Sequence, residues 1–338
     1  MIKRQHIKAD ALTICLIWVL LLLISTTAGA DPPQEYDIDR MKEDLRGAVT
    51  FRDKFYDAAV AGNRMWMVGY YGAILHFNGD TSRFEKQQSG TNLPLFDVTF
   101  LDANIGYIVG KRGIVLKTRD GGKSWVTIRK EGEFNLFAAH FIDSDTGWAV
   151  GDFGTILHTS DGGATWEDMS LKEADVTFNG CHFWNAQKGL IAGEFESIYL
   201  TQDGGATWSA VSEQSMAGAS LFDIHFKNAD HALAVGQNGV FFQTSNGGFT
   251  WKRQKMGNED NLLRIGVIDE RYHVVGLRGV MIEESPDGVL VTNDGYRVSD
   301  WLNCLISFSS GAAIAAGDHG RVLWSNGSHS QRAWEIIN

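Results

Sequence analysis

The chain has 338 residues, of which 44% are hydrophobic and 21% are charged, and its formal net charge is −11. This length fits two average domains or one large all-β domain. Binding to a phosphate backbone depends on Lys and Arg, so the acidic composition argues against nucleic acid as a partner and against direct binding to anionic lipid.

The first 30 residues follow the order of a secretory signal peptide. A basic start precedes the apolar stretch Ala11–Ile24, and the small residues Ala28-Gly29-Ala30 follow it. We therefore expect cleavage after Ala30 and export to the periplasm. An uncleaved anchor is the alternative, because the uncharged stretch Ala11–Ala30 has about the length that spans a membrane. Removal of residues 1–30 would take away three bases and one acid, which changes the net charge to −13.

The rest of the chain repeats itself about every 41 residues. The repeat is visible when the sequence is aligned on a glycine that ends a short apolar run, with gaps of 41, 41, 42, 43, 40 and 41 residues. The aligned glycines are Gly69, Gly110, Gly151, Gly193, Gly236, Gly276 and Gly317. A period in this range is typical of repeat folds.

One repeat contains four segments that are too short for helices. In the second repeat they are Leu95–Phe100, Ile105–Val109, Ile114–Lys117 and Trp125–Ile128, separated by turn sequences rich in Gly, Asp and Asn. Four short strands at this period predict a β-propeller blade. We expect a seven-bladed propeller of four-stranded antiparallel blades over residues 55–338, and a charged leader over 31–54 that covers the seam between the first and last blades.

A second motif recurs between the third and fourth strands of blades two to five. It reads TRDGGKSW, TSDGGATW, TQDGGATW and TSNGGFTW. Asp and Asn cap turns, the glycines permit positive φ, and the Trp can bury its ring between blades. Because Asn replaces Asp in one copy and the copies point in different directions, we interpret the motif as structural. Its key residues are Asp120, Trp125, Asp161, Trp166, Asp203, Trp208, Asn246 and Trp251.

These stretches resemble the Asp-box, or bacterial neuraminidase repeat. The larger unit, present in blade three as FIDSDTGWAVGDFGTILHTSDGGATW, resembles the photosystem II stability/assembly factor family over nearly all of the expected mature chain. The resemblance implies an exported, non-enzymatic propeller that binds membrane-protein subunits during complex assembly. Photosynthetic members carry an arginine-rich patch on the middle blades, whereas this chain has no Arg between Arg129 and Arg253. An envelope transporter or another multi-subunit membrane complex is therefore an alternative client.

The candidate partner-binding residues lie in the turns between the second and third strands. The flanking pattern G-x-x-G is present in six blades while the residues inside it vary, as in the binding surfaces of repeat proteins. Blade four loses the second glycine to Glu196 or Ser197, depending on the alignment. The turn residues are Tyr70, Tyr71, Lys111, Arg112, Asp152, Phe153, Glu194, Phe195, Glu196, Gln237, Asn238, Leu277, Arg278, Asp318 and His319.

A carbohydrate-active enzyme or a lectin is the alternative function at these positions. Asp152, Glu194 and Glu196 could supply paired carboxylates to a sialidase-like enzyme, with Arg112, Arg264 and Arg278 as the scattered arginines that a sialidase would need. No motif around these residues matches such an enzyme, so we expect no enzymatic activity.

Three histidines raise the question of a metal. His140, His182 and His225 occupy equivalent positions in three adjacent innermost strands. Equivalent residues on neighbouring sheets point the same relative way and do not easily meet one ion. We therefore expect packing histidines, no metal and no cofactor. Cys181 and Cys304, which remain after cleavage, are expected to be buried and unpaired, and the protein to be monomeric without its partner.

Overall fold

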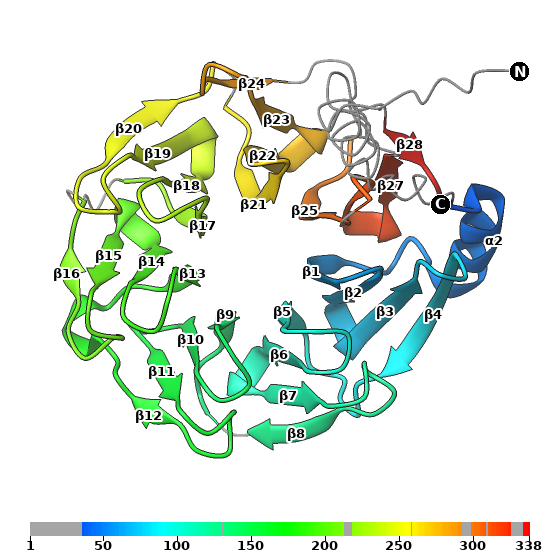
Figure 1. The fold of residues 1–338 in the computed structure, drawn as a ribbon, viewed down its shortest axis with the longest axis horizontal. Coiled ribbons are helices and arrows are strands. Elements are labelled where there is room, and N and C mark those ends of the chain that lie inside the picture. The colour runs from blue at the N-terminus through cyan, green and yellow to red at the C-terminus, as the bar shows by residue number, and fades with distance from the viewer. Residues whose placement is uncertain are drawn as a thin grey trace, which may run out of the picture. The chain divides into compact units, whose positions relative to one another are not determined.

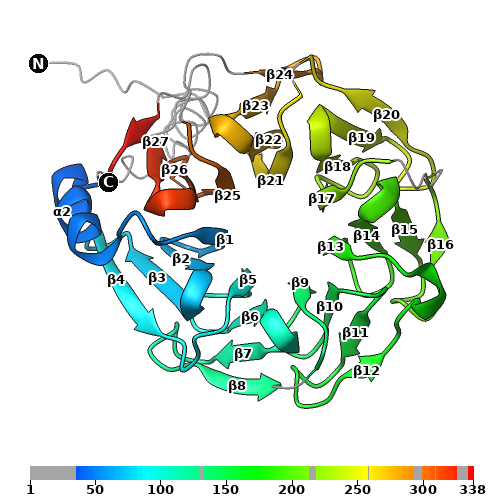
Figure 2. The ribbon, with the colours of Figure 1, turned by 180° about the vertical axis from the view of Figure 1, so that it is seen from behind.

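Seven four-stranded antiparallel sheets stand around a central axis in the computed structural model (Figures 1 and 2). The structure describes residues 36–129, 132–212, 218–257, 259–292, 299–308, 310–325 and 334–338. The predicted signal peptide and residues 31–35 of the predicted leader lie outside this set. All seven sheets belong to the unit Asp37–Asn338. The predicted seven-bladed β-propeller is confirmed.

Each blade consists of four consecutive strands, with the first strand nearest the axis. Blades one to three contain β1 (Phe55–Ala61), β2 (Arg64–Gly69), β3 (Ala73–Asn78), β4 (Arg83–Gln88), β5 (Leu95–Phe100), β6 (Gly106–Gly110), β7 (Val115–Thr118), β8 (Val126–Arg129), β9 (Leu136–Phe141), β10 (Gly147–Gly151), β11 (Ile156–Thr159) and β12 (Glu167–Asp168). Blades four and five contain β13 (Phe178–Phe183), β14 (Gly189–Gly193), β15 (Ile198–Thr201), β16 (Ser209–Ala210), β17 (Leu221–Phe226), β18 (Ala232–Gly236), β19 (Val240–Thr244) and β20 (Lys252–Lys255). Blades six and seven contain β21 (Leu262–Ile268), β22 (Arg271–Gly276), β23 (Met281–Glu284), β24 (Leu290–Thr292), β25 (Leu302–Ser307), β26 (Ala313–Gly317), β27 (Val322–Ser325) and β28 (Glu335–Ile336).

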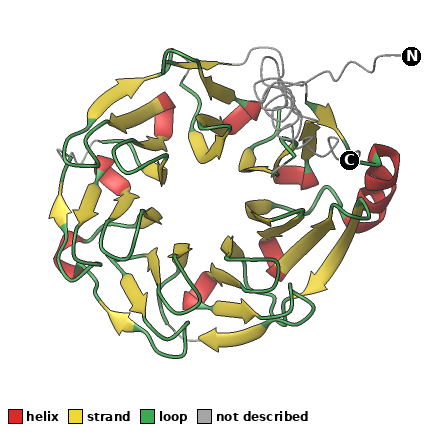
Figure 3. Cartoon of the chain, viewed as in Figure 1, coloured by secondary structure: helices red, strands yellow, loops and turns green. Residues whose placement is uncertain are grey.

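The helical elements are short except for α2 (Ile38–Ala48). Six single-turn 3-10 helices connect second and third strands, and Figure 3 shows α2 and the 3-10 helices in red. These turns are η1 (Tyr70–Gly72), η2 (Lys111–Gly113), η4 (Glu194–Glu196), η5 (Gln237–Gly239), η6 (Leu277–Gly279) and η7 (Asp318–Gly320), while η3 (Lys172–Ala174) lies between blades three and four. No helix among the described residues is both long and apolar enough to cross a membrane.

An aromatic residue at the start of the outer strand fills most interfaces between blades. Trp125 packs against apolar residues of blades one and two, and Trp166, Trp208 and Trp251 fill the next three interfaces in the same way. Each Trp comes directly before the outer strand rather than within it. The strand pairing shows which residue of every blade stands at the position of these Trp residues. These residues are Phe84, Trp125, Trp166, Trp208, Trp251, Leu290 and Trp334.

The turn before each of the four Trp residues is closed by its own side chains. In blade two, Ser124 N and Ser124 Oγ donate to the two oxygens of Asp120 at 2.9 and 2.6 Å, and Gly122 N donates to Thr118 Oγ1 at 2.8 Å. Hydrogen bonds from Thr165 likewise lower the pKa of Asp161 to about 2. In blade five, Thr250 N donates to Asn246 Oδ1 at 3.0 Å, so the amide retains this bond. The Asp or Asn side chain therefore caps this turn in each of the four blades.

A buried arginine joins four blades at the axis. Arg264 of β21 lies 3.0 Å from Asp57, 3.5 Å from Asp97 and 3.9 Å from Asp223, measured between guanidinium nitrogens and carboxylate oxygens. The second oxygen of each Asp accepts a backbone N–H from the next blade, at 2.8–2.9 Å. Arg264 occupies the strand position that the three Asp residues occupy in their own blades.

Burial and the neighbouring charges both shift the pKa values of the groups at this site. Burial alone would lower the pKa of Arg264, but the three carboxylates outweigh it and raise that pKa. Burial raises the pKa of Asp97, and the neighbouring charge of Asp57 raises it further.

The ring is closed by contacts between blades seven and one. Asn303 Nδ2 donates to Phe55 O at 3.0 Å, and Gly320 N donates to Asp53 O at 2.7 Å. The helix α2 lies beside this seam: Asp44 accepts from Arg83 Nε at 2.7 Å on blade one, and Lys42 pairs with Glu335 on blade seven. The segment 37–54 therefore contacts both blades.

Replacing Arg264 by Met is expected to destabilise the propeller by about 3–5 kcal/mol, because three buried carboxylates lose their counter-ion. Urea denaturation followed by tryptophan fluorescence measures this change. Arg119→Met, at an exposed arginine, is the control and should change the unfolding free energy by less than about 0.5 kcal/mol. Equal stability of the two variants would contradict the role assigned to Arg264.

Candidate partner-binding face

The turns between second and third strands have the same backbone in all seven blades. The middle residue of each has a left-handed φ between 54° and 60°, a region that costs an L-residue roughly 1–2 kcal/mol. A glycine follows it in six blades. The middle residues are Tyr71, Arg112, Phe153, Phe195, Asn238, Arg278 and His319.

The side chains on this frame differ from blade to blade. Tyr71 is 70% exposed and Phe153 is 66% exposed, and the ring of Tyr70 lies 4.5 Å from that of Tyr71 between centroids. Blade two presents the exposed cations Lys111 and Arg112. Large exposed aromatic rings beside cations are typical of protein-binding surfaces.

Several polar turn residues hold the chain rather than project into solvent. Asp152 Oδ2 accepts from Asn135 N at 2.8 Å, and Glu194 Oε2 accepts from Thr177 N at 2.9 Å. Gln237 accepts from a backbone N–H in the same way at 3.1 Å. These three side chains fix the connection that enters the blade, so each positions its turn.

Two further turn residues are held by ion pairs, and a third, His319, by a hydrogen bond. Asp318 lies 3.3 Å from Lys54, and His319 Nδ1 lies 3.0 Å from Asp300. Arg278 pairs with Asp260. The side chains of Tyr71, Lys111, Arg112 and Phe153 are therefore the most available for a partner.

Blade four departs from the shared frame at Glu196. This residue, and not Ser197, takes the place of the glycine, with φ 58°. Its buried carboxylate receives two hydrogen bonds from Arg253 Nε, at 3.0 and 3.1 Å, and one from Nη2 at 2.8 Å. Burial would raise the pKa of Glu196, but the bonds from Arg253 and Ala219 N outweigh it and lower that pKa.

An inner circle of half-buried residues lies between the turns and the axis. Each first strand has a register shift, typical of a β-bulge, at its second residue. The bulge residues are Tyr56, Phe96, Phe137, Asn179, Phe222, Leu263 and Asn303. The ring centroid of Phe96 lies 5.6 Å from that of Tyr56 and 5.2 Å from that of Phe137. Sequence reasoning missed this circle, although an aromatic residue at the second strand position in four blades was a usable signal.

Below the circle, the axis encloses a cavity of about 330 Å³ lined by Arg264, its carboxylate partners and three histidines. The ring centroids of His140 and His182 are 4.3 Å apart, and those of His182 and His225 are 3.9 Å apart. Burial lowers the pKa of His140 to about 3 and also lowers the pKa of the other two. Within the described ranges, no group of His, Cys, Asp and Glu could hold a metal ion. Cys181 and Cys304 are buried and free.

The residues considered for glycoside hydrolysis are engaged elsewhere. Asp152 and Glu194 hold backbone N–H groups, Glu196 is paired with Arg253, and Arg264 is paired within the axis. Arg112 and Arg278 lie in turns of blades two and six.

Comparisons with known proteins place this geometry in context. Residues 78–214 match the family model described as photosynthesis system II assembly factor YCF48. The predicted family resemblance is confirmed. The matched stretch runs from the end of β3 to the loop after β16. A comparison with curated protein sequences gave no match.

Solved structures agree on the fold. A structure of YCF48 bound to a D1 peptide is 15% identical, with a TM-score of 0.67, and the alignment covers 83% of this chain and 96% of that chain. YCF48 from Cyanidioschyzon merolae is 14% identical, with a TM-score of 0.66 and coverage of 81% and 95%. A GH74 xyloglucanase from Xanthomonas campestris is 12% identical, with a TM-score of 0.67 and coverage of 86% and 55%. At such identities the likeness shows the fold alone, since one fold carries many functions.

Arg253→Met is expected to destabilise the native protein by about 1–2 kcal/mol, because Glu196 is buried while Arg253 is half exposed. In a Glu196→Gly background the same change should cost less than about 0.5 kcal/mol, since glycine tolerates this φ without a charge. A double-mutant cycle from chemical denaturation measures the coupling. Additive effects would show that the ion pair contributes nothing.

Acidification from pH 6.5 should destabilise the protein through its buried histidines. The unfolded chain takes up protons near pH 6.5 while His140, with a pKa of about 3, does not, so stability is lost as the pH falls. Thr99 occupies the equivalent position in blade two, so His140→Thr is the matched variant. Between pH 6 and 4, the free energy of unfolding should fall less steeply for this variant than for the native protein. The difference should be up to about 1 kcal/mol per pH unit. Parallel pH profiles would contradict this.

Proposed function

We propose that this chain is a non-enzymatic assembly factor that docks a segment of a membrane-protein partner on the face formed by the strand-two-to-three turns. The observation that carries the proposal is the pair of exposed rings, Tyr71 and Phe153, held outward by strained turns above the aromatic bulge circle. All seven turns share this backbone, so the exposed ring at its middle position is what distinguishes blades one and three.

The comparisons support this proposal at the level of the family. The family model names an assembly factor, and one structural relative is described with a bound D1 peptide. For this chain we propose a peptide segment of an envelope transporter or another multi-subunit membrane complex as the client. The middle blades offer few cations to an acidic client, since Arg129 and Arg253 bound a stretch without arginine.

Export to the periplasm belongs to the same proposal. It rests on the basic, apolar and small-residue order of residues 1–30. Such a location would place the docking face beside the exported segments of membrane proteins.

Replacing Tyr71 and Phe153 together by Ala is expected to lower client capture by at least about tenfold, because each ring buries a large apolar area on docking. A photo-crosslinker at Asn238, in the same circle of turns, measures capture in membranes. Phe249 is 51% exposed in the Asn246 turn on the opposite face, so Phe249→Ala is the matched control and should capture normally. Equal loss in both variants, or no loss in either, would contradict the docking face.

A further inference from the structure

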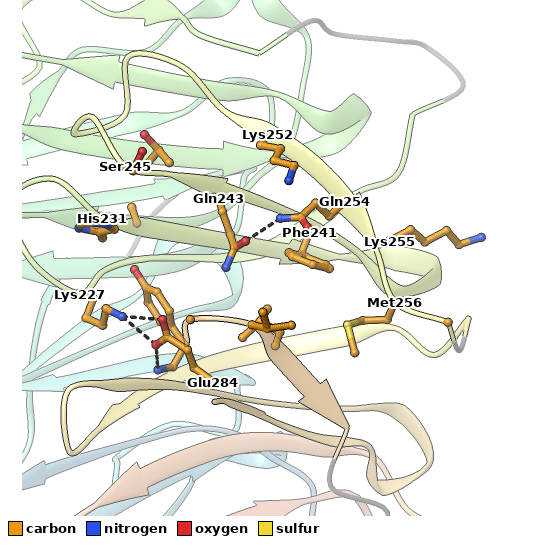
Figure 4. Close-up of a pocket in the computed structure, with 17 residues that line it drawn as sticks. Lys227, His231, Phe241, Gln243, Ser245, Lys252, Gln254, Lys255, Met256 and Glu284 are labelled. Carbon is orange, nitrogen blue, oxygen red and sulfur yellow. Dashed lines mark hydrogen bonds and ion pairs between the residues drawn. The ribbon is translucent and has the colours of Figure 1, made fainter. Parts of the chain in front are cut away.

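A second cavity lies away from this face, on the outer side of the ring between blades five and six. It has a volume of about 740 Å³, within the range of small-ligand pockets. Figure 4 shows Phe241, Gln243 and Gln254 on the blade-five side and Glu284 on the blade-six side. We call this cavity the groove between blades five and six, and strand register explains why it exists.

The aromatic residue that starts the outer strand is absent from blade six alone. Leu290 is opposite Glu284, as Phe84 is opposite Phe77 in blade one, and it therefore stands where five blades carry a Trp. The residue is buried and lines the groove. A leucine in the position of an indole leaves space in a packed interface.

The blade-five wall carries, at the matching register position, the residue type that accepts from an indole in one other interface. In the interface between blades one and two, Trp125 Nε1 donates to Gln87 Oε1 at 3.2 Å. Gln87 pairs with Ile74, the second residue after the turn glycine, and Gln254 pairs with Phe241 at the same register. Gln254 lines the groove, and its Nε2 donates to Gln243 Oε1 at 2.6 Å, which leaves Oε1 as the acceptor of this side chain.

The floor of the groove also retains an aromatic ring. In blade two, Trp125 meets Phe100 at 5.8 Å and 89°, and Phe100 is paired with Gly106. In blade six the same pair is Val267 and Tyr272, so the ring has moved to the neighbouring strand.

Tyr272 brings a polar atom to this floor. It is 3% exposed and lines the groove, and its Oη has no partner in hydrogen-bonding geometry among the described residues. A buried hydroxyl without a partner is costly unless a ligand supplies one.

The groove is basic on an acidic chain. Its lining contains Lys227, Lys252 and Lys255 but only one carboxylate, Glu284, which Lys227 neutralises at 2.7 Å. Lys255 pairs with the exposed Glu259, and Lys252 has no ion pair among the described residues. The remaining charge attracts acidic groups.

We propose that the groove between blades five and six binds a tryptophan side chain from an acidic segment of a partner protein. The partner supplies the ring that blade six lacks, its indole N–H donates to Gln254, and its acidic residues meet Lys252. This site is independent of the docking face, because it lies on the rim and shares no residue with the turns.

The test uses isothermal titration of the full mature chain with synthetic peptides at low salt. One peptide has a single Trp flanked on both sides by Asp and Glu, a second has Ala in place of Trp, and a third has Lys in place of the acids. We expect the acidic Trp peptide to bind at least about tenfold more tightly than either of the others. No measurable binding at millimolar peptide, or equal binding of the Ala peptide, would overturn the proposal.

Leu290→Trp restores the missing ring within the chain and should weaken peptide binding by at least about tenfold. Val291→Trp adds the same ring at the neighbouring, half-exposed position and is the matched control, with binding within about twofold of native. If Leu290→Trp does not fold, Gln254→Met removes the acceptor and should weaken binding by about three- to tenfold. Native binding by Leu290→Trp, or by Gln254→Met where that variant is needed, would overturn the proposal.

Sedimentation of the native chain and Leu290→Trp tests a second copy as the occupant. The chain carries exposed tryptophans at positions 184 and 301, so a native dimer that Leu290→Trp abolishes would show self-association and overturn the assignment to a partner. Monomers in both samples, together with peptide binding, support it.

Discussion

Every interface between blades depends on one side chain that fills the wedge between two diverging sheets. Sheets arranged around an axis separate toward the rim, so a small residue near the axis and a large one outside give even packing. Trp125, Trp166, Trp208 and Trp251 supply the large residue in four interfaces. Trp334 supplies it between blades six and seven, and Phe84 supplies it at the seam between blades seven and one. In blades two to five, the capped turn before the Trp fixes where its ring enters. The repeated motif is thus a packing device, and function belongs to the positions that the device leaves variable.

At the axis the same geometry brings polar groups together. First strands from seven blades converge, and any charge placed there is shared among blades. Asp57, Asp97 and Asp223 each make two contacts there. One carboxylate oxygen accepts a backbone N–H from the next blade, and the other faces Arg264. A single guanidinium therefore fixes the relative positions of blades one, two, five and six. In these four blades, the sheets that carry the turns between second and third strands are held near the axis by this network, and the packing between blades holds them farther out.

The architecture could be predicted from the sequence because it depends on a pattern repeated seven times. Strand order, blade number and the capping turn are each predicted from several copies of the repeat, so one irregular copy does not change the prediction. The exceptions could not be predicted, because each is a single substitution whose partner lies in another blade. Glu196 is explained only by Arg253, and Arg264 only by three distant carboxylates. The bulge that turns Phe96 toward Phe137 depends on register, which alternation alone does not determine.

Departures from the repeat therefore carry more functional information than the repeat itself. A blade that loses its wedge must either close up or leave a cavity, and closing is resisted by the two neighbouring interfaces, which retain Trp251 and Trp334. The space beside Leu290 is thus preserved by the rest of the ring, with Gln254 on its wall and the ring of Tyr272 on its floor. On a rigid ring, the interface that lacks its aromatic wedge is the natural place for a partner to supply one. The turn face would meet a partner through its variable residues, whereas this groove would meet one through a repeated packing geometry with one part missing.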